Sequence, residues 1–172
     1  YDRNIGEKKI GSAEEKLREI NPDIAVRALD ARIGEGNAKK LVGKADGIVD
    51  AVDNYPARYI LNRVAMEKGI PLFHGAIRGM YGQATTIIPG KTPCLACIFP
   101  SPPPAEVFAV VGVTPGLIGM VQANEVLKYL LGTGELLANR LFLWDGLQGQ
   151  ATEICVERNP ACGVCGDRTE DA

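Results

Sequence analysis

Two Cys-x-x-Cys pairs, "CLAC" and "CGVC", constrain the fold of this chain more than any other feature, because they hold four of its five cysteines and stand far apart in the sequence. A spacer of two residues lets both sulfur atoms of a pair face one ion, and four thiolates can enclose a Zn²⁺ ion tetrahedrally at about 2.3 Å. Proline and glycine around the second pair, in "NPACGVCG", are typical of a zinc knuckle. The sequence therefore predicts one structural zinc site with the ligands Cys94, Cys97, Cys162 and Cys165.

A redox role is the alternative for these pairs, and it requires a pair at the N-terminus of a helix, where the pKa of a thiol is lowered. We expect neither pair to begin a helix, and a closed four-thiolate site leaves no open position for a substrate. The zinc ion would therefore stabilise the fold. The fifth cysteine, Cys155 in "TEICVER", is predicted to pack within a strand, with a reactive thiol as the alternative.

The size and charge of the chain exclude several classes of protein. Its 172 residues, 46% of them hydrophobic, fit one ordinary domain with a core of its own. A net charge of −2 and a pI near 5.5 offer no basic surface for nucleic acid. The longest apolar run, "VFAVVGV", is too short to span a bilayer, and the first residues lack the apolar core of a signal peptide. We expect a cytoplasmic protein, in which paired thiols bind metal more readily than they form structural disulfides.

The order of the predicted elements is that of an α/β protein. Apolar residues at helical spacing and at alternating positions predict helices and strands in turn. Helices are expected within 5–21, 36–44, 54–69 and 114–132, and strands within 23–30, 45–53, 70–79, 80–90 and a hairpin over 140–159. This order predicts a Rossmann-like sheet with parallel strands first and antiparallel strands later, and with helices on both faces.

The helix from Thr114 is the longest one predicted. Thr114 is expected to be its N-cap residue and Pro115 its first helical residue. Six apolar residues at helical spacing form a stripe along it: Leu117, Met120, Ala123, Leu127, Leu130 and Leu131. Before this helix, the prolines of "FPSPPPAEVF" are incompatible with a helix and predict an extended connection.

Five motifs follow one another along the chain: "DAVDNYPARYILN", "IPLFHGAIRGMYGQATTIIPG", "PCLAC", "GVTPGLIGMVQANEVLKYLLG" and "NPACGVCG". With them the chain resembles the ThiF/MoeB/HesA family, the bacterial and archaeal relatives of ubiquitin-activating enzymes. The resemblance covers nearly the whole chain and implies ATP-dependent adenylation, with Mg²⁺, of the C-terminal glycine of a small ubiquitin-fold sulfur-carrier protein that ends in Gly-Gly. It also implies a homodimer with one four-cysteine zinc site per subunit.

The resemblance implies a single domain over 1–172 with three parts. Residues 1–90 would be the nucleotide-binding half, 91–112 the first cysteine pair and the crossover loop, and 113–172 the carrier-binding half with the second pair. In the family a glycine-rich loop, a ribose-binding acid and an arginine near the triphosphate precede the position of Tyr1. We therefore expect a domain that is incomplete at its N-terminus, with an incomplete ATP site.

Some family members carry a catalytic cysteine in the crossover loop. The corresponding position in this chain is close to Phe108, and no cysteine stands between Cys97 and Cys155. We therefore expect adenylation without a thioester step on this loop. The proline-rich run would cover the carrier tail, which would thread beneath it as an extended strand held by main-chain hydrogen bonds.

The family motifs imply that Asp53, Asn54 and Lys9 belong to the nucleotide site. Asp53 ends a predicted strand just before a helix, where a carboxylate can hold the Mg²⁺ ion of a nucleotide. Helix capping by Asp53 or Asn54 is the alternative, and Asp50 is the nearest rival carboxylate, although we expect it within the strand. Lys9, in "GEKK", would pair with a phosphate; a solvated lysine on a helix surface is the alternative.

Four further residues are assigned from the same motifs. Arg58, in "PAR", is expected to support the site structurally. Arg78 and Gln83 border the two strands that face the carrier tail in the family, and either could hydrogen-bond an extended peptide, with an ordinary surface role as the alternative. His74, the single histidine, stands in "LFHGA" and is predicted to be a buried, hydrogen-bonded residue rather than a catalytic base.

Two other classes of function remain open. The first is a non-catalytic, zinc-stabilised subunit that docks a ubiquitin-fold partner. The second, a nicotinamide-dependent dehydrogenase, explains the α/β pattern but not the two cysteine pairs, and the chain contains no G-x-G-x-x-G motif. The sequence does not distinguish between carriers for thiamine, molybdopterin, cysteine or tRNA thiolation.

Overall fold

The computed structural model describes residues 4–102 and 108–166. The chain divides into two compact units, Tyr1–Ile33 and Gly34–Ala172, and each unit is considered by itself. Among the described residues, none of the helices combines the length and the apolar character that a bilayer crossing requires.

The first unit contains helix α1 (Lys9–Ile20), which confirms the helix predicted within 5–21. It ends before Pro22, whose ring is incompatible with a continuing helix. The strand predicted over 23–30 is wrong, because this segment forms no strand in the described structure. Backbone groups of a strand need a neighbouring strand as partner, and here the Ala31 N–H donates instead to the Leu29 carbonyl oxygen (2.9 Å).

The second unit holds the sheet. Its elements, in chain order, are α2 (Ala38–Val42), β1 (Ile48–Asp50), α3 (Tyr55–Lys68), β2 (Leu72–Arg78), β3 (Tyr81–Ile87), α4 (Leu95–Ile98), α5 (Val113–Leu131), β4 (Arg140–Asp145) and β5 (Gln150–Cys155).

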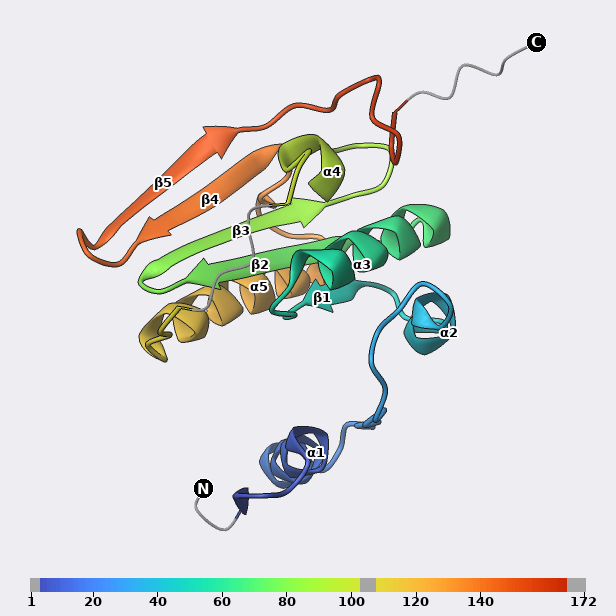
Figure 1. Cartoon of the computed structure of the whole chain (residues 1–172), viewed down its shortest axis with the longest axis vertical. Coiled ribbons are helices and arrows are strands. Elements are labelled where there is room, and N and C mark those ends of the chain that lie inside the picture. The colour runs from blue at the N-terminus through green and yellow to red at the C-terminus, as the bar shows by residue number, and fades with distance from the viewer. Residues whose placement is uncertain (1–3, 103–107, 167–172) are drawn as a thin grey trace. The chain divides into compact units, whose positions relative to one another are not determined.

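The five strands lie in the order β1-β2-β3-β4-β5 (Figure 1). β1 and β2 are parallel, with Asp50 opposite His74, and every later neighbour is antiparallel. The hairpin between β2 and β3 turns at Gly79, whose φ of 60° lies in the left-handed region that glycine adopts without strain. The predicted sheet, parallel and then antiparallel, is confirmed.

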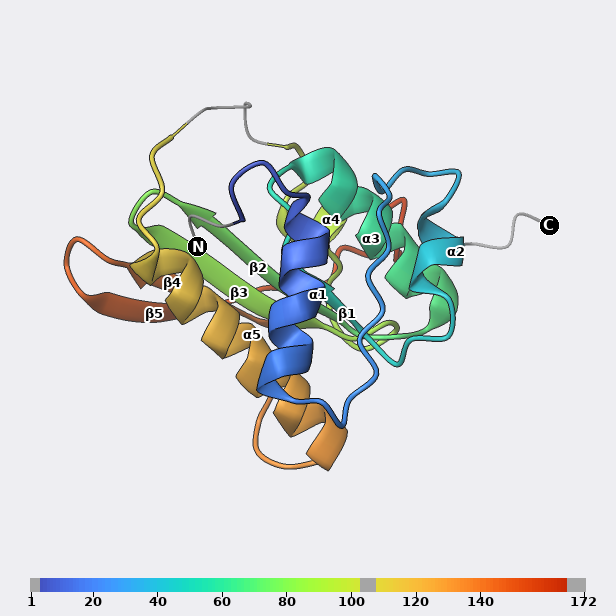
Figure 2. The same ribbon diagram turned by 90° about the horizontal axis from the view of Figure 1, so that it is seen from below.

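Helices cover both faces of this sheet, as predicted. Phe73 of β2 packs edge-on against Tyr129 of α5, whereas the neighbouring His74 faces the opposite side and meets Arg58 of α3. Side chains alternate between faces along a strand, so α5 and α3 lie on opposite faces (Figure 2). The close approach of α5 depends on Gly75 of β2, because a Cβ atom there would lie 2.4 Å from the Gln122 side chain.

Helix α5 places buried polar residues, together with Ile118, against the sheet, and most of its predicted apolar stripe is exposed. Gln122 and Glu125 are buried, and Gln122 Nε2 donates to the carbonyl oxygens of Asp50 (2.8 Å) and Phe73 (2.9 Å). In the predicted apolar stripe, by contrast, Met120 is 72% exposed. The predicted helix is confirmed, but its apolar stripe is not the face that packs on the sheet.

The start of α5 differs from the prediction. The helix begins at Val113 with Gly112 as its N-cap residue, so Thr114 is not the cap and Pro115 is not the first helical residue. The Thr114 side chain is buried, and its hydroxyl has no hydrogen-bond partner among the described residues. Proline is tolerated within the first helical turn, where its missing N–H group costs no helical hydrogen bond, so the motif does not specify the first residue.

Candidate functional site

The four paired cysteines come together in space. Their Sγ atoms all lie within 4.8 Å of one another, with 3.7 Å between Cys94 and Cys162 and 3.3 Å between Cys97 and Cys165. In a tetrahedral zinc site with Zn–S bonds of about 2.3 Å, the sulfur atoms are about 3.8 Å apart. The cluster confirms that the two pairs converge, and its four sulfur donors fit one structural zinc ion.

One helical turn and one tight turn position these sulfur atoms. Cys94 is the N-cap residue of α4, so the prediction that neither pair begins a helix is wrong for the first pair. A helix of this length has no apolar period that a sequence could reveal. In the second pair the Gly166 N–H donates to the Cys162 carbonyl oxygen (2.8 Å), and a Cβ atom at Gly166 would lie 2.4 Å from the Pro160 carbonyl oxygen.

The surroundings of the thiols affect their ionisation in opposite directions. Burial raises the pKa of the Cys94 thiol well above its ordinary value, and the neighbouring Asn62 amide opposes this effect. Burial also raises the pKa of Cys162, but the backbone groups of Cys165 and Val164 outweigh it and the pKa falls to about 7. A metal ion binds thiolates, so zinc would displace the protons that remain on the cluster.

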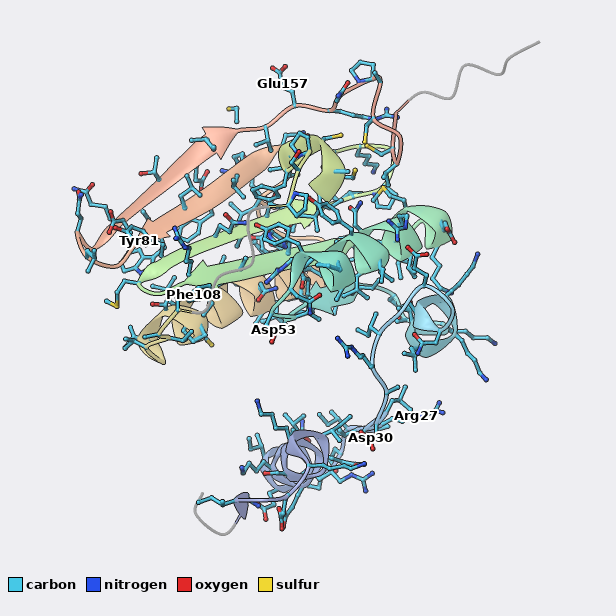
Figure 3. The ribbon with its side chains drawn as sticks, in the orientation of Figure 1. Arg27, Asp30, Asp53, Tyr81, Phe108 and Glu157 are labelled. Carbon is cyan, nitrogen blue, oxygen red and sulfur yellow. The ribbon has the colours of Figure 1, made fainter. Side chains whose placement is uncertain are left out.

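A cavity of about 940 Å³ lies on the face of the sheet that α3 also covers. The segment that begins α3, the end of β2 and the segment at Phe108 contribute to its lining, and Figure 3 labels Asp53, Phe108 and Tyr81 around it. Its floor consists of two rows of residues that stand opposite one another across β3, β4 and β5: Tyr81, Asp145 and Gln150 in one row, and Gln83, Leu143 and Thr152 in the other.

Asp53 and Asn54 stand where the chain enters α3. Asn54 is the N-cap residue, because its Oδ1 accepts a hydrogen bond from the Ala57 N–H (3.0 Å). Its Nδ2 donates to Asp53 Oδ1 (3.1 Å). The capping alternative therefore holds for Asn54, whereas Asp53 is exposed and lines the cavity. The positive end of the helix dipole favours anions at this place, and a carboxylate beside it is suited to hold their metal ion.

A buried polar network lies behind the cavity. Asp50 and His74 are 0% exposed, and Asp50 Oδ2 lies 2.7 Å from His74 Nδ1. Arg58 Nη1 donates to Asp50 Oδ2 (2.8 Å) and to the Gly75 carbonyl oxygen (2.6 Å). Asp50 thus lies at the end of the strand, and its carboxylate is taken up by buried partners. Arg58 lines the cavity and connects it to this network, which agrees with the structural role predicted for it.

His74 is the buried, hydrogen-bonded histidine that the sequence predicts. Burial lowers its pKa below 6.5, the ordinary value for histidine, and this effect exceeds the raising effect of Asp50. Arg58 lowers the pKa further. At neutral pH the ring is therefore uncharged and carries a single N–H group.

Four of the residues predicted for the nucleotide and the carrier line this one cavity: Asp53, Asn54, Arg78 and Gln83. The fifth, Lys9, begins α1 in the other unit, where it is exposed and lines a cavity of about 410 Å³. The functional roles of all five stay predictions. Of the crossover loop, residues 103–107 lie outside the described residues, and Phe108 lines the larger cavity.

Sequence reasoning misses Tyr81, Trp144 and Asp145, which also line the cavity. The single tryptophan of the chain is the signal that could have indicated a binding surface. Which face of β4 meets a cavity, however, depends on contacts with distant segments. The prediction for Cys155 is wrong in part: it lies in β5, but it is exposed, because β5 is an edge strand whose residues are all exposed.

The chain matches the ThiF family model over residues 1–164. It is 41% identical to the SAMP-activating enzyme E1 of Haloferax volcanii, in a match that covers 99% of this chain and 65% of that protein. It is 40% identical to the sulfur carrier protein adenylyltransferase of Thermus thermophilus, over 95% of this chain and 65% of that protein. The chain thus spans less than two thirds of the length of these curated relatives.

Solved structures of MccB from E. coli have the same fold. The complex of MccB with SeMet MccA superposes with a TM-score of 0.85 at 19% identity, over 97% of this chain and 53% of that chain. The complex of MccB with ATP superposes with a TM-score of 0.80 at 20% identity, over 94% and 51% of the two chains. Similarity at this level of identity shows the fold alone. The family match and the two relatives point to the same family as the sequence motifs do. The chain belongs to the ThiF family.

Proposed function

We propose that this chain carries the site at which ATP adenylates the C-terminal glycine of a small sulfur-carrier protein. Membership of the ThiF family supports this function, as do two relatives that are an activating enzyme and a sulfur carrier adenylyltransferase. The carrier would have a ubiquitin fold and end in Gly-Gly, as the motif resemblance implies.

The observation that carries the proposal is that one cavity joins the N-terminus of α3 to the open face of strands β3 to β5. Asp53, beside the positive end of the helix dipole, offers a place for nucleotide phosphates and their metal ion. Arg78, Gln83 and the strand floor offer polar and aromatic partners to an extended peptide. The volume of about 940 Å³ suits a nucleotide together with the end of a peptide.

In the proposed reaction, a carboxylate oxygen of the terminal glycine attacks the α-phosphorus of ATP. The new P–O bond forms while the bond from that phosphorus to the bridging oxygen breaks, and pyrophosphate leaves with the electron pair. Because the nucleophile is already an anion, no side-chain base is needed, and catalysis consists of positioning and charge neutralisation. Asp53 would hold Mg²⁺, which supplies part of that neutralisation when bound. The pairing of Lys9 with a phosphate stays a prediction from the family motif.

The remaining features fit this function as structural supports. Zinc in the four-cysteine cluster would hold the C-terminal segment beside α4. Since no cysteine stands between Cys97 and Cys155, the reaction would proceed without a thioester on the crossover loop. The homodimer that the resemblance implies stays a prediction, and analytical ultracentrifugation would test it.

The test is ATP–pyrophosphate exchange, in the presence of a carrier ending in Gly-Gly, by the longest reading frame that contains this chain. Asp53→Ala is expected to lower the exchange rate by about 10²–10³-fold or more, the size of effect seen when one preorganised electrostatic contact is lost. Its fold and zinc content should not change. Asp46→Ala is the matched control, because Asp46 is an exposed carboxylate just before β1 and does not line the cavity.

Two results would contradict the proposal in different ways. Unchanged exchange by Asp53→Ala would refute the role of Asp53. No exchange by the wild-type protein, although it still binds the carrier, would identify the non-catalytic binding subunit as the correct function.

A further inference from the structure

Gln83 connects the buried network to the cavity. It lies on β3, lines the cavity floor, and places its amide Nε2 at 3.2 Å from His74 Nε2. The direction in which this amide points decides whether the cavity meets a hydrogen-bond donor or an acceptor, because one end of the group is NH₂ and the other is a carbonyl oxygen.

The contacts of His74 decide which of its ring nitrogens carries the proton. Nδ1 lies 2.7 Å from Asp50 Oδ2, and two acceptors would repel each other at this distance, so Nδ1 carries the hydrogen and donates it to the carboxylate. Arg58 Nη1 is also 3.3 Å from Nδ1, but its two N–H groups already have Asp50 and the Gly75 carbonyl oxygen as partners. Arg58 therefore does not donate to the ring.

A neutral histidine that donates through Nδ1 has a bare Nε2, which can only accept. Burial lowers the pKa of His74, with Asp50 and Arg58 as the charged groups that face it, and this keeps the ring neutral at neutral pH. Gln83 must then turn its NH₂ group toward Nε2. Its carbonyl oxygen is left for the other side, where Gln83 borders the cavity.

We propose that Asp50 and His74 hold the Gln83 amide with its carbonyl oxygen toward the cavity, so that Gln83 accepts a hydrogen bond from a main-chain N–H group of the bound peptide tail. His74 is a positioning residue in this arrangement, and Gln83 is a specificity-determining residue that selects a donor. This inference rests on the proposed function for the identity of the ligand. The orientation of the amide rests on the network alone.

The first test concerns the orientation and needs no carrier. Histidine labelled with ¹⁵N reports the protonated ring nitrogen through long-range ¹H–¹⁵N correlations, and the His74→Asn variant identifies the signal. We expect the tautomer with hydrogen on Nδ1 at neutral pH. A ring protonated on Nε2, or on both nitrogens, would overturn the inference, because Gln83 would then have to present its oxygen to the ring.

The second test measures the affinity for a carrier ending in Gly-Gly. Gln83→Met keeps the length of the side chain but removes the acceptor, and should weaken binding about 3–10-fold, the value of one hydrogen bond. Semisynthetic carriers with one N-methylated tail amide at a time identify the donor. One of these N-methylated carriers should bind the wild-type protein more weakly by the same factor. It should bind Gln83→Met no more weakly than the unmodified carrier does. Gln148→Met, an exposed glutamine outside the cavity, is the matched control.

The role of His74 is tested by His74→Phe, which should weaken binding of the carrier in the wild-type background and have no further effect in Gln83→Met. Should this variant fail to fold, the tautomer and the N-methyl series still decide the question. Binding of the carrier that is insensitive to Gln83→Met would overturn the inference while the proposed function stands. If the carrier does not bind at all, the proposed function fails, and the proposed ligand of Gln83 fails with it.

Discussion

His74 shows how a single residue can be classified from sequence while its role depends on its neighbours. Its place in an apolar strand predicts burial, and it is 0% exposed. The sequence does not show that Asp50, from a parallel strand, would stand opposite it in the sheet. That pairing supplies the partner without which a buried imidazole would be unfavourable.

The buried imidazole makes stability depend on pH. Above about 6.5 the ring is neutral in both the folded and the unfolded chain. Below this value the unfolded chain takes up a proton at His74, whereas the folded chain does not until its lowered pKa is reached. The free energy of unfolding should therefore fall as the pH falls from about 6.5, by up to about 1.4 kcal/mol per pH unit.

Urea unfolding of the wild type and of His74→Asn between pH 5 and 8 measures this pH dependence of the free energy of unfolding. The range brackets the usual histidine pKa of about 6.5. The difference between the two profiles removes the contributions of groups that both proteins share. Profiles that run parallel across the range would show that His74 does not couple protonation to folding.

Among the secondary elements, α5 departs furthest from its sequence pattern. Most of its apolar stripe is exposed, and it reaches the sheet through Gln122 and Glu125 as well as through Ile118. Glu125 Oε2 accepts from the Thr86 hydroxyl and from the Leu137 N–H, both at 2.6 Å. These polar contacts are satisfied, so the helix packs on β2 and β3 by hydrogen bonding as well as by apolar contact.

The contact between α5 and β2 predicts the effect of a single methyl group. Gly75→Ala would place a Cβ atom 2.4 Å from the Gln122 side chain, which is held by two carbonyl oxygens. We expect a loss of about 1–3 kcal/mol in the free energy of unfolding, as for an overpacked core. Denaturant unfolding measures this loss.

Gly119→Ala is the control for that measurement. Gly119 lies within α5, and beyond its chain neighbours and the backbone of its own helix no atom of the described residues comes within 4 Å of the position of a Cβ. Alanine in a helix is more favourable than glycine by about 0.5–1 kcal/mol, so this variant should be slightly more stable than the wild type. If both variants have the same stability, the close packing of α5 on Gly75 is refuted.

At the level of the whole molecule, the cysteine cluster joins parts of the chain that lie far apart in sequence. The first pair follows β3 and the second follows β5. Zinc binding to this cluster would stabilise the folded chain, since the four-cysteine site exists only when both segments are in place.

We expect one zinc ion per chain, measured by mass spectrometry of the metal, and a lower melting temperature after chelation. A free zinc concentration a hundredfold above the dissociation constant contributes about 2.7 kcal/mol, which corresponds to roughly 5–10 °C. Cys162→Ser should bind no zinc, and its melting temperature should be lower by the same amount as after chelation. Cys155→Ser removes a thiol outside the cluster and should keep both. Equal zinc content in the two variants would contradict the assignment of the ligands.

Much of this fold follows from local patterns. The helix of Tyr55–Lys68 and the hairpin at Gly79 each depend on residues close together in the chain, so periodicity and turn chemistry are sufficient to predict them. The strand expected over 23–30 is wrong because it was inferred from local alternation. Alternation shows a tendency to extend, but it does not show whether a partner strand is present.

The amino-acid sequence alone thus identified the class of fold, the family motifs, the four cysteines that cluster and the polar residues at the α3 N-terminus. The three-dimensional arrangement determined which face of α5 is buried, how Asp50, Arg58 and His74 share hydrogen bonds, and that Gln83 borders both this network and the cavity. The physical reason is that burial and hydrogen bonding depend on contacts between segments distant in sequence, whereas propensity and spacing are local properties of the chain.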